Sequence, residues 1–357
     1  MSDQQNIRRL DSIKARSAYS DATQGAFLGA AIGDAIGYQV EFTGIKSRQD
    51  DRCVDGFNTS NQFSDDTQMA YAVARGLLAE GKLRPIPPSS WDDCLNSDLD
   101  RAMTLVAREF ARWLESPLGG SHRAPGGKCT SSVSEFARDG GSHWSRAAGD
   151  RTNQGNGGGC GGVMRALPAA LLYTGRVSEY AAIWQGRITH AAPLSDAACG
   201  AMGYMVGAIR NGNESWESNV ILVARELDPE GDTADRIEDA LARWESSPLR
   251  ADGGGDPGAG VLDDYEGWAG HDAIAAALCI YKRFDRGLTD FRGAILEAAN
   301  SPGDSDSIAC LVGGLAGLKT GLKGLPVEWV EGLELIEELS DMGRSIADAA
   351  VNYKFGL

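Results

Sequence analysis

Long hydrophobic runs and paired cysteines are missing from this sequence, and strand-like alternation is scarce. No stretch of about 18 consecutive apolar residues occurs, so we expect no transmembrane helix. The seven cysteines stand singly and their number is odd, which argues against a disulfide framework or a structural zinc site. Residues 1–21 are polar and lack the apolar middle of a signal peptide, so we expect a cytoplasmic protein.

Positive charge is also scarce relative to negative charge. The chain has 34 Lys and Arg against 50 Asp and Glu, a formal net charge of −16. This balance argues against nonspecific binding to nucleic acid or to an anionic membrane surface, although a local nucleotide site is compatible with it. With 357 residues, 42% hydrophobic and 24% charged, the chain has the composition of a globular protein that buries a core without covalent staples.

What the sequence does contain is apolar residues at helical spacing. They recur every three or four positions within residues 27–36, 103–114, 237–244 and 274–281. Strand-like alternation is scarce, and neither an internal repeat nor a low-complexity tract is found. These patterns predict a compact all-α protein.

The first helical segment carries small residues at a regular interval and a possible start signal. Asp21, followed by Gln24 three residues later, resembles a capping box at the beginning of this helix. Small residues four apart let helices approach closely, although each glycine costs roughly 1 kcal/mol of helix propensity. The glycines in question are Gly25, Gly29, Gly33 and Gly37.

Three segments rich in Gly, Ser, Pro or Asp are predicted to be loops. They are residues 119–127, 138–162 and 246–260, and helical patterns resume after each, so none is expected to link domains. We therefore predict a single domain over residues 22–357. Residues 1–21 form an N-terminal arm with a local excess of basic residues, for which a disordered tail and a partner-binding segment are both open interpretations.

Two acidic clusters, residues 63–69 and 303–308, each stand directly before a helical pattern. The simpler interpretation is capping, because Ser and Asp are preferred N-caps and carboxylates favour the positive end of a helix. However, each cluster supplies two aspartates and a serine, the hard oxygen donors that Mg²⁺, Mn²⁺ or Ca²⁺ require. If the two helix starts met, they could hold two ions about 4 Å apart. From spacing alone, both interpretations stay open.

Five motifs in order along the chain resemble the ADP-ribosylglycohydrolase family. The resemblance covers nearly the whole chain, and its strength comes from the order of the motifs, since each of them alone is weak. The motifs are residues 25–37 followed by Glu41, residues 64–69, the Gly-rich Met-Arg segment 159–168, Thr189-His190 with Pro193, and residues 303–307.

The resemblance implies an orthogonal multi-helix fold with a binuclear magnesium or manganese site. Glu41 and Asp304 would then be catalytic, with Glu41 near the scissile bond. His190 would contact ADP-ribose, and backbone N–H groups of the glycine-rich stretch would bind its diphosphate. The implied metal ligands are Ser64, Asp65, Asp66, Asp304, Asp306 and Ser307. The implied substrate-binding residues are Gly159, Cys160, Gly161, Gly162 and His190.

Each of these residues also has a simpler interpretation. Glu41 could be a helix-end carboxylate, the glycine stretch a flexible loop, and His190 a cap or core residue. Asp34, inside the first motif, is expected to be structural rather than catalytic.

The implied activity is metal-dependent hydrolysis of the bond between ADP-ribose and a protein side chain, with arginine favoured. Such an enzyme could serve as an immunity protein, its arm at residues 1–21 binding a cognate ADP-ribosyltransferase. Two alternatives are a non-catalytic partner that sequesters such a transferase, and a metal-dependent phosphoesterase or nucleotide pyrophosphatase. The products distinguish them: free ADP-ribose, none, or AMP.

Overall fold

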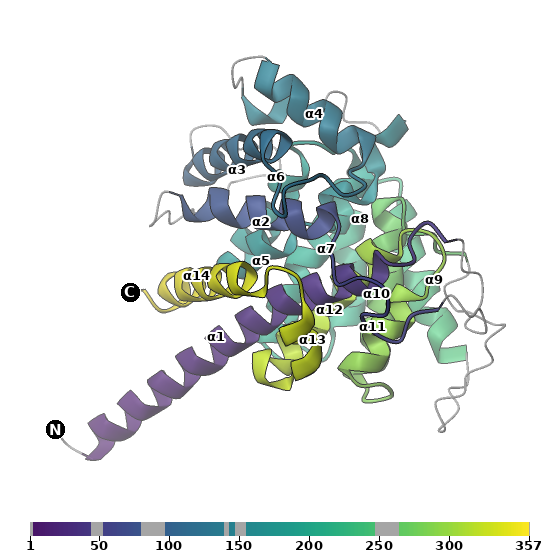
Figure 1. Ribbon diagram of the computed structural model, residues 1–357. Helices are drawn as coiled ribbons and strands as arrows, with labels where there is room; N and C mark the ends of the chain where they lie inside the picture. The colour runs from purple at the N-terminus through teal and green to yellow at the C-terminus, as the bar shows by residue number, and fades with distance from the viewer. Residues whose placement is uncertain are drawn as a thin grey trace.

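The computed structural model describes residues 3–43, 53–79, 97–138, 143–146, 155–246 and 264–356. Within these ranges the chain is helical and has no β-strand, which confirms the predicted all-α class (Figure 1). The helices are α1 (Asp3–Gly37), α2 (Asp65–Leu78), α3 (Asp98–Glu115), α4 (Gly127–Arg138), α5 (Leu167–Leu172), α6 (Arg176–Gly186), α7 (Pro193–Arg210), α8 (Trp216–Leu227), α9 (Asp232–Ser246), α10 (Gly270–Asp285), α11 (Phe291–Ala299), α12 (Ser305–Thr320), α13 (Val327–Gly332) and α14 (Ile336–Phe355). Short 3-10 helices cover Trp144–Arg146, Gly155–Gly158, Cys160–Gly162 and Leu322–Gly324.

Helix α3 illustrates how the periodic pattern becomes a packed helix. The Ser97 side chain accepts a hydrogen bond from the Asp100 amide at 3.0 Å and so caps the helix. Met103, Val106 and Phe110 are each fully buried on one face. Burying a side chain of this size contributes about 1.5–3 kcal/mol. The other three segments with predicted helical periodicity lie in α1, α9 and α10.

The glycines of α1 lie against the backbone of α12, as their four-residue spacing predicted. A Cβ atom on Gly33 would stand 2.0 Å from the Ala309 carbonyl oxygen, and one on Gly29 would stand 2.4 Å from that of Gly313. No larger residue fits at these positions unless the helices separate. The contact extends to Gly37, whose Cβ would lie 2.6 Å from Cα of Asp306. It therefore places the end of α1 beside the acidic start of α12.

Helix α1 begins at Asp3, so the predicted start near Asp21 is wrong. The helix continues through the arm because its inner part is anchored: the Tyr19 ring meets the Phe355 ring edge-to-face at 6.0 Å, and the Arg210 guanidinium lies 4.1 Å from the Tyr19 ring centroid. Extending a helix that is already nucleated costs little. The first turns project away from the rest of the protein (Figure 1). Partner binding by residues 1–21 stays a prediction.

The predicted loops are described only in part. Residues 119–126 precede α4 and contain no helix, in agreement with the prediction. Of residues 138–162, those described beyond the end of α4 form short 3-10 turns and an isolated bridge. Most of the segment 246–260 lies outside the described residues. None of the six cysteines in the described part of the chain is joined in a disulfide.

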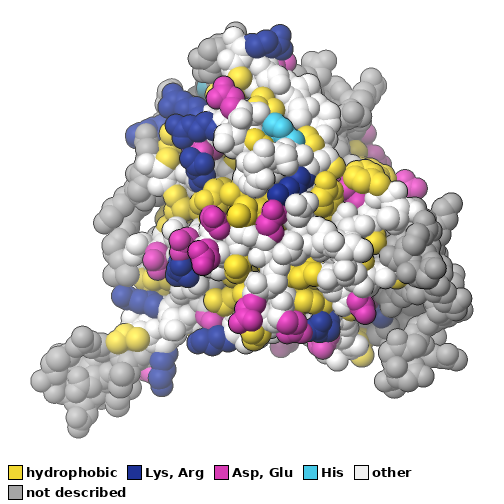
Figure 2. All heavy atoms as spheres, viewed as in Figure 1, with side chains coloured by type: hydrophobic (Ala, Val, Ile, Leu, Met, Phe, Trp, Pro, Cys, Tyr) yellow, Lys and Arg dark blue, Asp and Glu magenta, His cyan; other side chains and the backbone are white. Residues whose placement is uncertain are grey.

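On the face drawn in Figure 2, basic side chains gather mainly along the side where α2 and α3 lie. The arginines of these helices pair locally: Arg75 contacts Glu109 at 3.1 Å, and Arg112 also contacts Glu109. Such pairing neutralises part of the positive patch. No described helix has the length and hydropathy needed to cross a bilayer.

Candidate active site

The start of α2 presents two buried carboxylates. Ser64 is its N-cap, and the Ser64 hydroxyl accepts a hydrogen bond from the Asp66 amide at 3.2 Å. Capping is therefore done by the serine, so Asp65 and Asp66 are available for another role. One oxygen of each carboxylate, Oδ2, is buried without a hydrogen-bond partner among the described residues. An unpartnered buried carboxylate oxygen is costly unless something else binds it.

The start of α12 has a similar arrangement. Asp304 occupies its N-cap position but makes no side-chain capping bond. The Asp304 amide instead donates to the Glu266 carbonyl at 2.7 Å, and its Oδ2 accepts a hydrogen bond from the Cys160 thiol at 2.8 Å. Asp306 Oδ1 accepts from the Ser307 amide at 2.9 Å. The Asp304 carboxylate thus makes no capping bond to its own helix and instead accepts the thiol hydrogen of Cys160.

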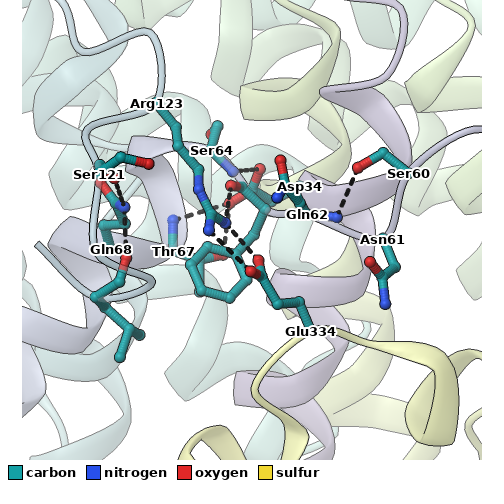
Figure 3. A network of polar contacts seen from close by, with 12 residues as sticks. Asp34, Ser60, Asn61, Gln62, Ser64, Thr67, Gln68, Ser121, Arg123 and Glu334 are labelled. Carbon is teal, nitrogen blue, oxygen red and sulfur yellow. Dashed lines mark hydrogen bonds and ion pairs between the residues drawn. The ribbon is translucent and has the colours of Figure 1, made fainter.

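Asp34 connects α1 to the start of α2 (Figure 3). Its Oδ1 accepts a hydrogen bond from the Ser64 amide at 2.8 Å, and its Oδ2 accepts from the Thr67 amide at 2.9 Å and from the Thr67 hydroxyl at 2.5 Å. All its partners are backbone or side-chain donors of α2, which agrees with the structural role expected for Asp34.

Arg123 also holds the residues at the start of α2 in place (Figure 3). The buried guanidinium donates to the Phe63 carbonyl at 2.9 Å and to Glu334 Oε1 at 2.9 Å. The Arg123 carbonyl accepts a hydrogen bond from the Asp65 amide at 3.1 Å. Contacts from α1, the 119–126 loop and the segment before α14 therefore fix the position of Asp65.

The two helix starts meet at one cavity of about 450 Å³. Carboxylate oxygens of Glu41, Asp304 and Asp306, one from each residue, lie within 4.8 Å of one another. The convergence that the acidic clusters suggested is therefore present. The predicted residues that line the cavity are Glu41, Asp65, Asp66, Gly159, Cys160, Gly161, His190, Asp304, Asp306 and Ser307. Ser64 and Gly162 are buried nearby and are not part of its wall.

Burial and mutual repulsion make this cluster reluctant to ionise. Both effects raise the pKa of Glu41, to about 10, with burial the larger cause and Asp306 the next. Burial also raises the pKa values of Asp65, Asp66 and Asp304 well above the usual range. A bound divalent cation would remove this repulsion. The unpartnered oxygens of Asp65, Asp66 and Glu41 supply the hard donors that Mg²⁺ or Mn²⁺ prefers, so these residues fit such ions.

The glycine-rich segment forms a part of the cavity wall that packs against the first turn of α4. The Cys160 amide donates to the Trp268 carbonyl at 3.0 Å, and Gly159 pairs with Ala269 in an isolated bridge. The Cys160 amide, one of the donors predicted for the diphosphate, is therefore already engaged. A Cβ on Gly161 would come within 2.7 Å of both Cys129 Sγ and His190 Cε1, so glycine is required there by packing. The segment is held in place rather than being a flexible loop.

His190 is buried at the cavity wall. Its Nδ1 lies 2.8 Å from the Thr189 hydroxyl. Burial, with a smaller contribution from Arg165, lowers the His190 pKa to about 3, so the ring is neutral at pH 7. Arg165, from the Met-Arg pair, donates to the Gln185 and Thr189 side chains and lies 4.6 Å from the Phe110 ring centroid. These contacts position the wall around His190.

Several cavity residues were not predicted from the sequence. They include Lys128 near the start of α4 and Trp268 before α10. Lys128 stands just after a segment predicted only as a loop, and Trp268 lies in none of the motifs. Trp268 is held at the cavity by the hydrogen bond from the Cys160 amide to its carbonyl. These two residues are far apart in the sequence. The sequence signal is the neighbouring Gly267, because a glycine is favoured where a sharp turn requires a positive φ, here +78°.

The sequence profile of the ADP-ribosylglycohydrolase family matches residues 15–354. The chain belongs to this family. It is 27% identical over 326 residues to the ADP-ribosyl-[dinitrogen reductase] glycohydrolase of Rhodospirillum rubrum, covering 88% of this chain and 91% of that protein. It is 25% identical over 338 residues to the ADP-ribosylarginine hydrolase Tri1 of Pseudomonas putida strain GB-1, covering 92% of this chain and 79% of that one.

The fold is also found among solved structures. An ADP-ribosylglycohydrolase-related protein complex superposes with a TM-score of 0.67 at 22% identity, covering 94% of this chain and 99% of that chain. Because relatives along the whole chain are hydrolases by name, this member of the ADP-ribosylglycohydrolase family is a hydrolase.

Proposed function

We propose that this protein removes ADP-ribose from a modified side chain of a cytoplasmic protein, with arginine as the favoured linkage. One observation carries the proposal: two helix starts bring buried, unpartnered carboxylate oxygens to a cavity. Among the relatives, one is named an ADP-ribosylarginine hydrolase, which supports the arginine linkage.

The residues suited to hold two Mg²⁺ or Mn²⁺ ions are Ser64, Asp65, Asp66, Asp304, Asp306 and Ser307. When bound, such ions would orient the ribose hydroxyls and favour the ionised form of the surrounding carboxylates. Ser64 does not line the cavity and acts on the metal site indirectly. Its hydroxyl accepts the Asp66 amide and so positions Asp66.

The protein's own residues then supply the proton transfer and the fit. Glu41 lies at the cavity with Oε2 unpartnered, so it is placed to take a proton from water or from a ribose hydroxyl. Loss of the leaving group builds oxocarbenium character at the anomeric carbon, as in other glycosidic cleavage. Lys128 and the start of α4, which line the cavity beside the glycine-rich segment, provide positive potential for the diphosphate.

The test is incubation with defined arginine-linked and serine-linked ADP-ribosyl peptides, with and without Mg²⁺. Release of free ADP-ribose from the arginine-linked peptide, only with metal, is expected. AMP as the product would mean a phosphoesterase or pyrophosphatase. Tight binding without any product would mean a sequestering partner.

We further propose an immunity role in which the arm binds a cognate ADP-ribosyltransferase. The first turns of α1 project from the protein, and Ile13 is 53% exposed there. Deleting residues 1–13 removes these turns together with Ile13 and leaves the Tyr19 and Arg16 contacts with Phe355 in place. The deletion should keep hydrolysis of peptides and weaken transferase binding, whereas Asp304→Ala should do the reverse. Unchanged transferase binding after the deletion would refute a role for the arm.

A further inference from the structure

Two aromatic rings stand exposed beside the cavity. Phe42 is 68% exposed and Trp268 is 45% exposed, which places both among the few large hydrophobic side chains left in water. The rings stack on each other, with centroids 6.3 Å apart and planes at 24°. Apolar area that stays exposed in this way is a common mark of a binding surface.

The pair is tied to the carboxylate cluster on both sides. Phe42 directly follows Glu41, in a turn closed by a hydrogen bond from the Thr43 amide to the Val40 carbonyl at 3.0 Å. Trp268 lines the cavity, and its carbonyl is held by the Cys160 amide at 3.0 Å. The rings are therefore positioned by the same segments that position the reacting groups.

The segment before Trp268 is pressed against Asp304. Gly267 adopts φ +78°, and a Cβ there would lie 3.1 Å from Cβ of Asp304 and 2.9 Å from Ile308 Cδ1. The neighbouring Glu266 carbonyl accepts the Asp304 amide at 2.7 Å. The backbone that leads into Trp268 is thus held against the start of α12, which fixes the point from which the indole projects.

We propose that the Phe42–Trp268 pair binds the guanidinium of the ADP-ribosylated arginine and so determines which linkage is cleaved. This inference rests on the proposed function and adds the residues that recognise the leaving group. Glu41 marks the end of the cavity where the bond is cleaved. The arginine side chain of the modified protein, which is the leaving group, should therefore lie next to the residues that neighbour Glu41. These neighbours are the two exposed rings.

The chemistry of a guanidinium suits this surface. It is planar, delocalised and weakly hydrated, and it stacks on aromatic faces. A serine-linked substrate presents an ether-like oxygen and a peptide backbone at the same place, with nothing planar or cationic to stack. The pair should therefore favour arginine-linked over serine-linked ADP-ribose.

The experiment compares Phe42→Ala and Trp268→Ala with the wild-type protein on both linkages. Loss of a guanidinium–aromatic contact corresponds to a fall of about 5- to 30-fold in kcat/KM for the arginine-linked peptide. For Phe42→Ala, whose ring lies outside the cavity wall, we expect less than about a 2-fold change for the serine-linked peptide, on the same reasoning. If that peptide is not cleaved, its inhibition constant against the arginine-linked peptide replaces kcat/KM. Trp268→Phe should restore most of the arginine-linked activity.

The affinity for free ADP-ribose, measured by calorimetry, provides the second readout. It should be unchanged in Phe42→Ala, because the ring contacts only the leaving group. Leu222→Ala is the matched control, since Leu222 is 62% exposed on α8, away from the cavity. Equal losses on both linkages, or weakened ADP-ribose binding in both ring variants, would assign the rings to the nucleotide and overturn the inference. Wild-type protein that releases no ADP-ribose from either peptide would instead refute the proposed function itself.

Discussion

The Asp34 carboxylate on α1 accepts both the amide and the hydroxyl hydrogen of Thr67 on α2, at 2.9 and 2.5 Å. Its other oxygen accepts the Ser64 amide at 2.8 Å. One buried side chain thus accepts hydrogen bonds from the residues on either side of Asp65 and Asp66, which line the cavity. This makes Asp34 the residue through which α1 sets the position of Asp65 and Asp66.

Asp34→Ala should destabilise the protein and weaken metal binding together. The change leaves buried donors on Ser64 and Thr67 without an acceptor, and each such group costs about 1–3 kcal/mol. We expect the free energy of unfolding, from urea titration, to fall by about 3 kcal/mol on this basis. Asp34→Asn, which keeps one acceptor oxygen, should lose less. If either variant kept full stability while turnover collapsed, Asp34 would belong to the chemistry instead.

Asp304→Ala and Asp306→Ala should each abolish most activity and lower Mn²⁺ affinity, because each removes a carboxylate from the cluster. Calorimetric titration of Mn²⁺ into protein dialysed against EDTA measures the affinity directly. Asp341→Ala is a suitable control, since the Asp341 side chain is 73% exposed on α14. Full activity in the EDTA-dialysed wild-type protein would refute the proposed metal site.

Glu41→Gln should reduce turnover much more than ADP-ribose binding. The amide keeps the shape of the side chain but cannot accept a proton, and a positioned acid–base group contributes typically about 10²–10⁴-fold. Single-turnover rates and calorimetric ADP-ribose affinities separate the two effects. Turnover equal to that of the wild type would move the search for the base to the aspartates at the two helix starts.

The metal-free protein should lose stability as pH rises. The pKa of Asp34 is raised to about 7 and that of Glu41 to about 10. Both groups ionise near pH 4 in an unfolded chain. The folded state therefore holds more protons above about pH 4, and its free energy of unfolding falls as pH rises through the folded-state pKa values.

The thermal midpoint of EDTA-treated protein should accordingly be lower at about pH 8 than at about pH 5. Added Mn²⁺ should stabilise most at the higher pH, where protons compete least for the carboxylates. The Asp304→Ala, Asp306→Ala double variant should show a shallower pH dependence, because less repulsion remains. An identical slope in this variant would place the origin of the effect elsewhere in this acidic protein.

Local patterns in the sequence were enough to predict parts of the fold, and the family resemblance identified half of the residues that line the cavity. The spacing of Gly29 and Gly33 predicted a close helix contact because helical periodicity is a local property. Ser64 predicted the start of α2 for the same reason, since capping is decided within one turn.

Other features depend on contacts that no local pattern contains. The start of α1 was misplaced because its anchor, the Tyr19–Phe355 contact, joins opposite ends of the chain. Trp268 was missed because only the fold brings it to Cys160. Gly162 was predicted at the substrate, but it packs instead toward Ser195, whose Oγ would lie 2.5 Å from an added Cβ. A glycine is therefore needed at this position because the interior leaves no room for a side chain.

The glycine contact between α1 and α12 also determines what kinds of change the site can survive. At Gly33 and Gly313 the two main chains touch with no side chains between them. The separation of the two backbones that carry the acidic groups is therefore set by direct main-chain contact. Substitutions in the apolar interior can be absorbed by repacking, and the spacing of the acidic groups should hardly respond. A methyl group added at Gly33 cannot be accommodated by repacking, because it would meet the main chain of α12. Gly33→Ala should therefore impair metal affinity more than many larger changes deeper in the core.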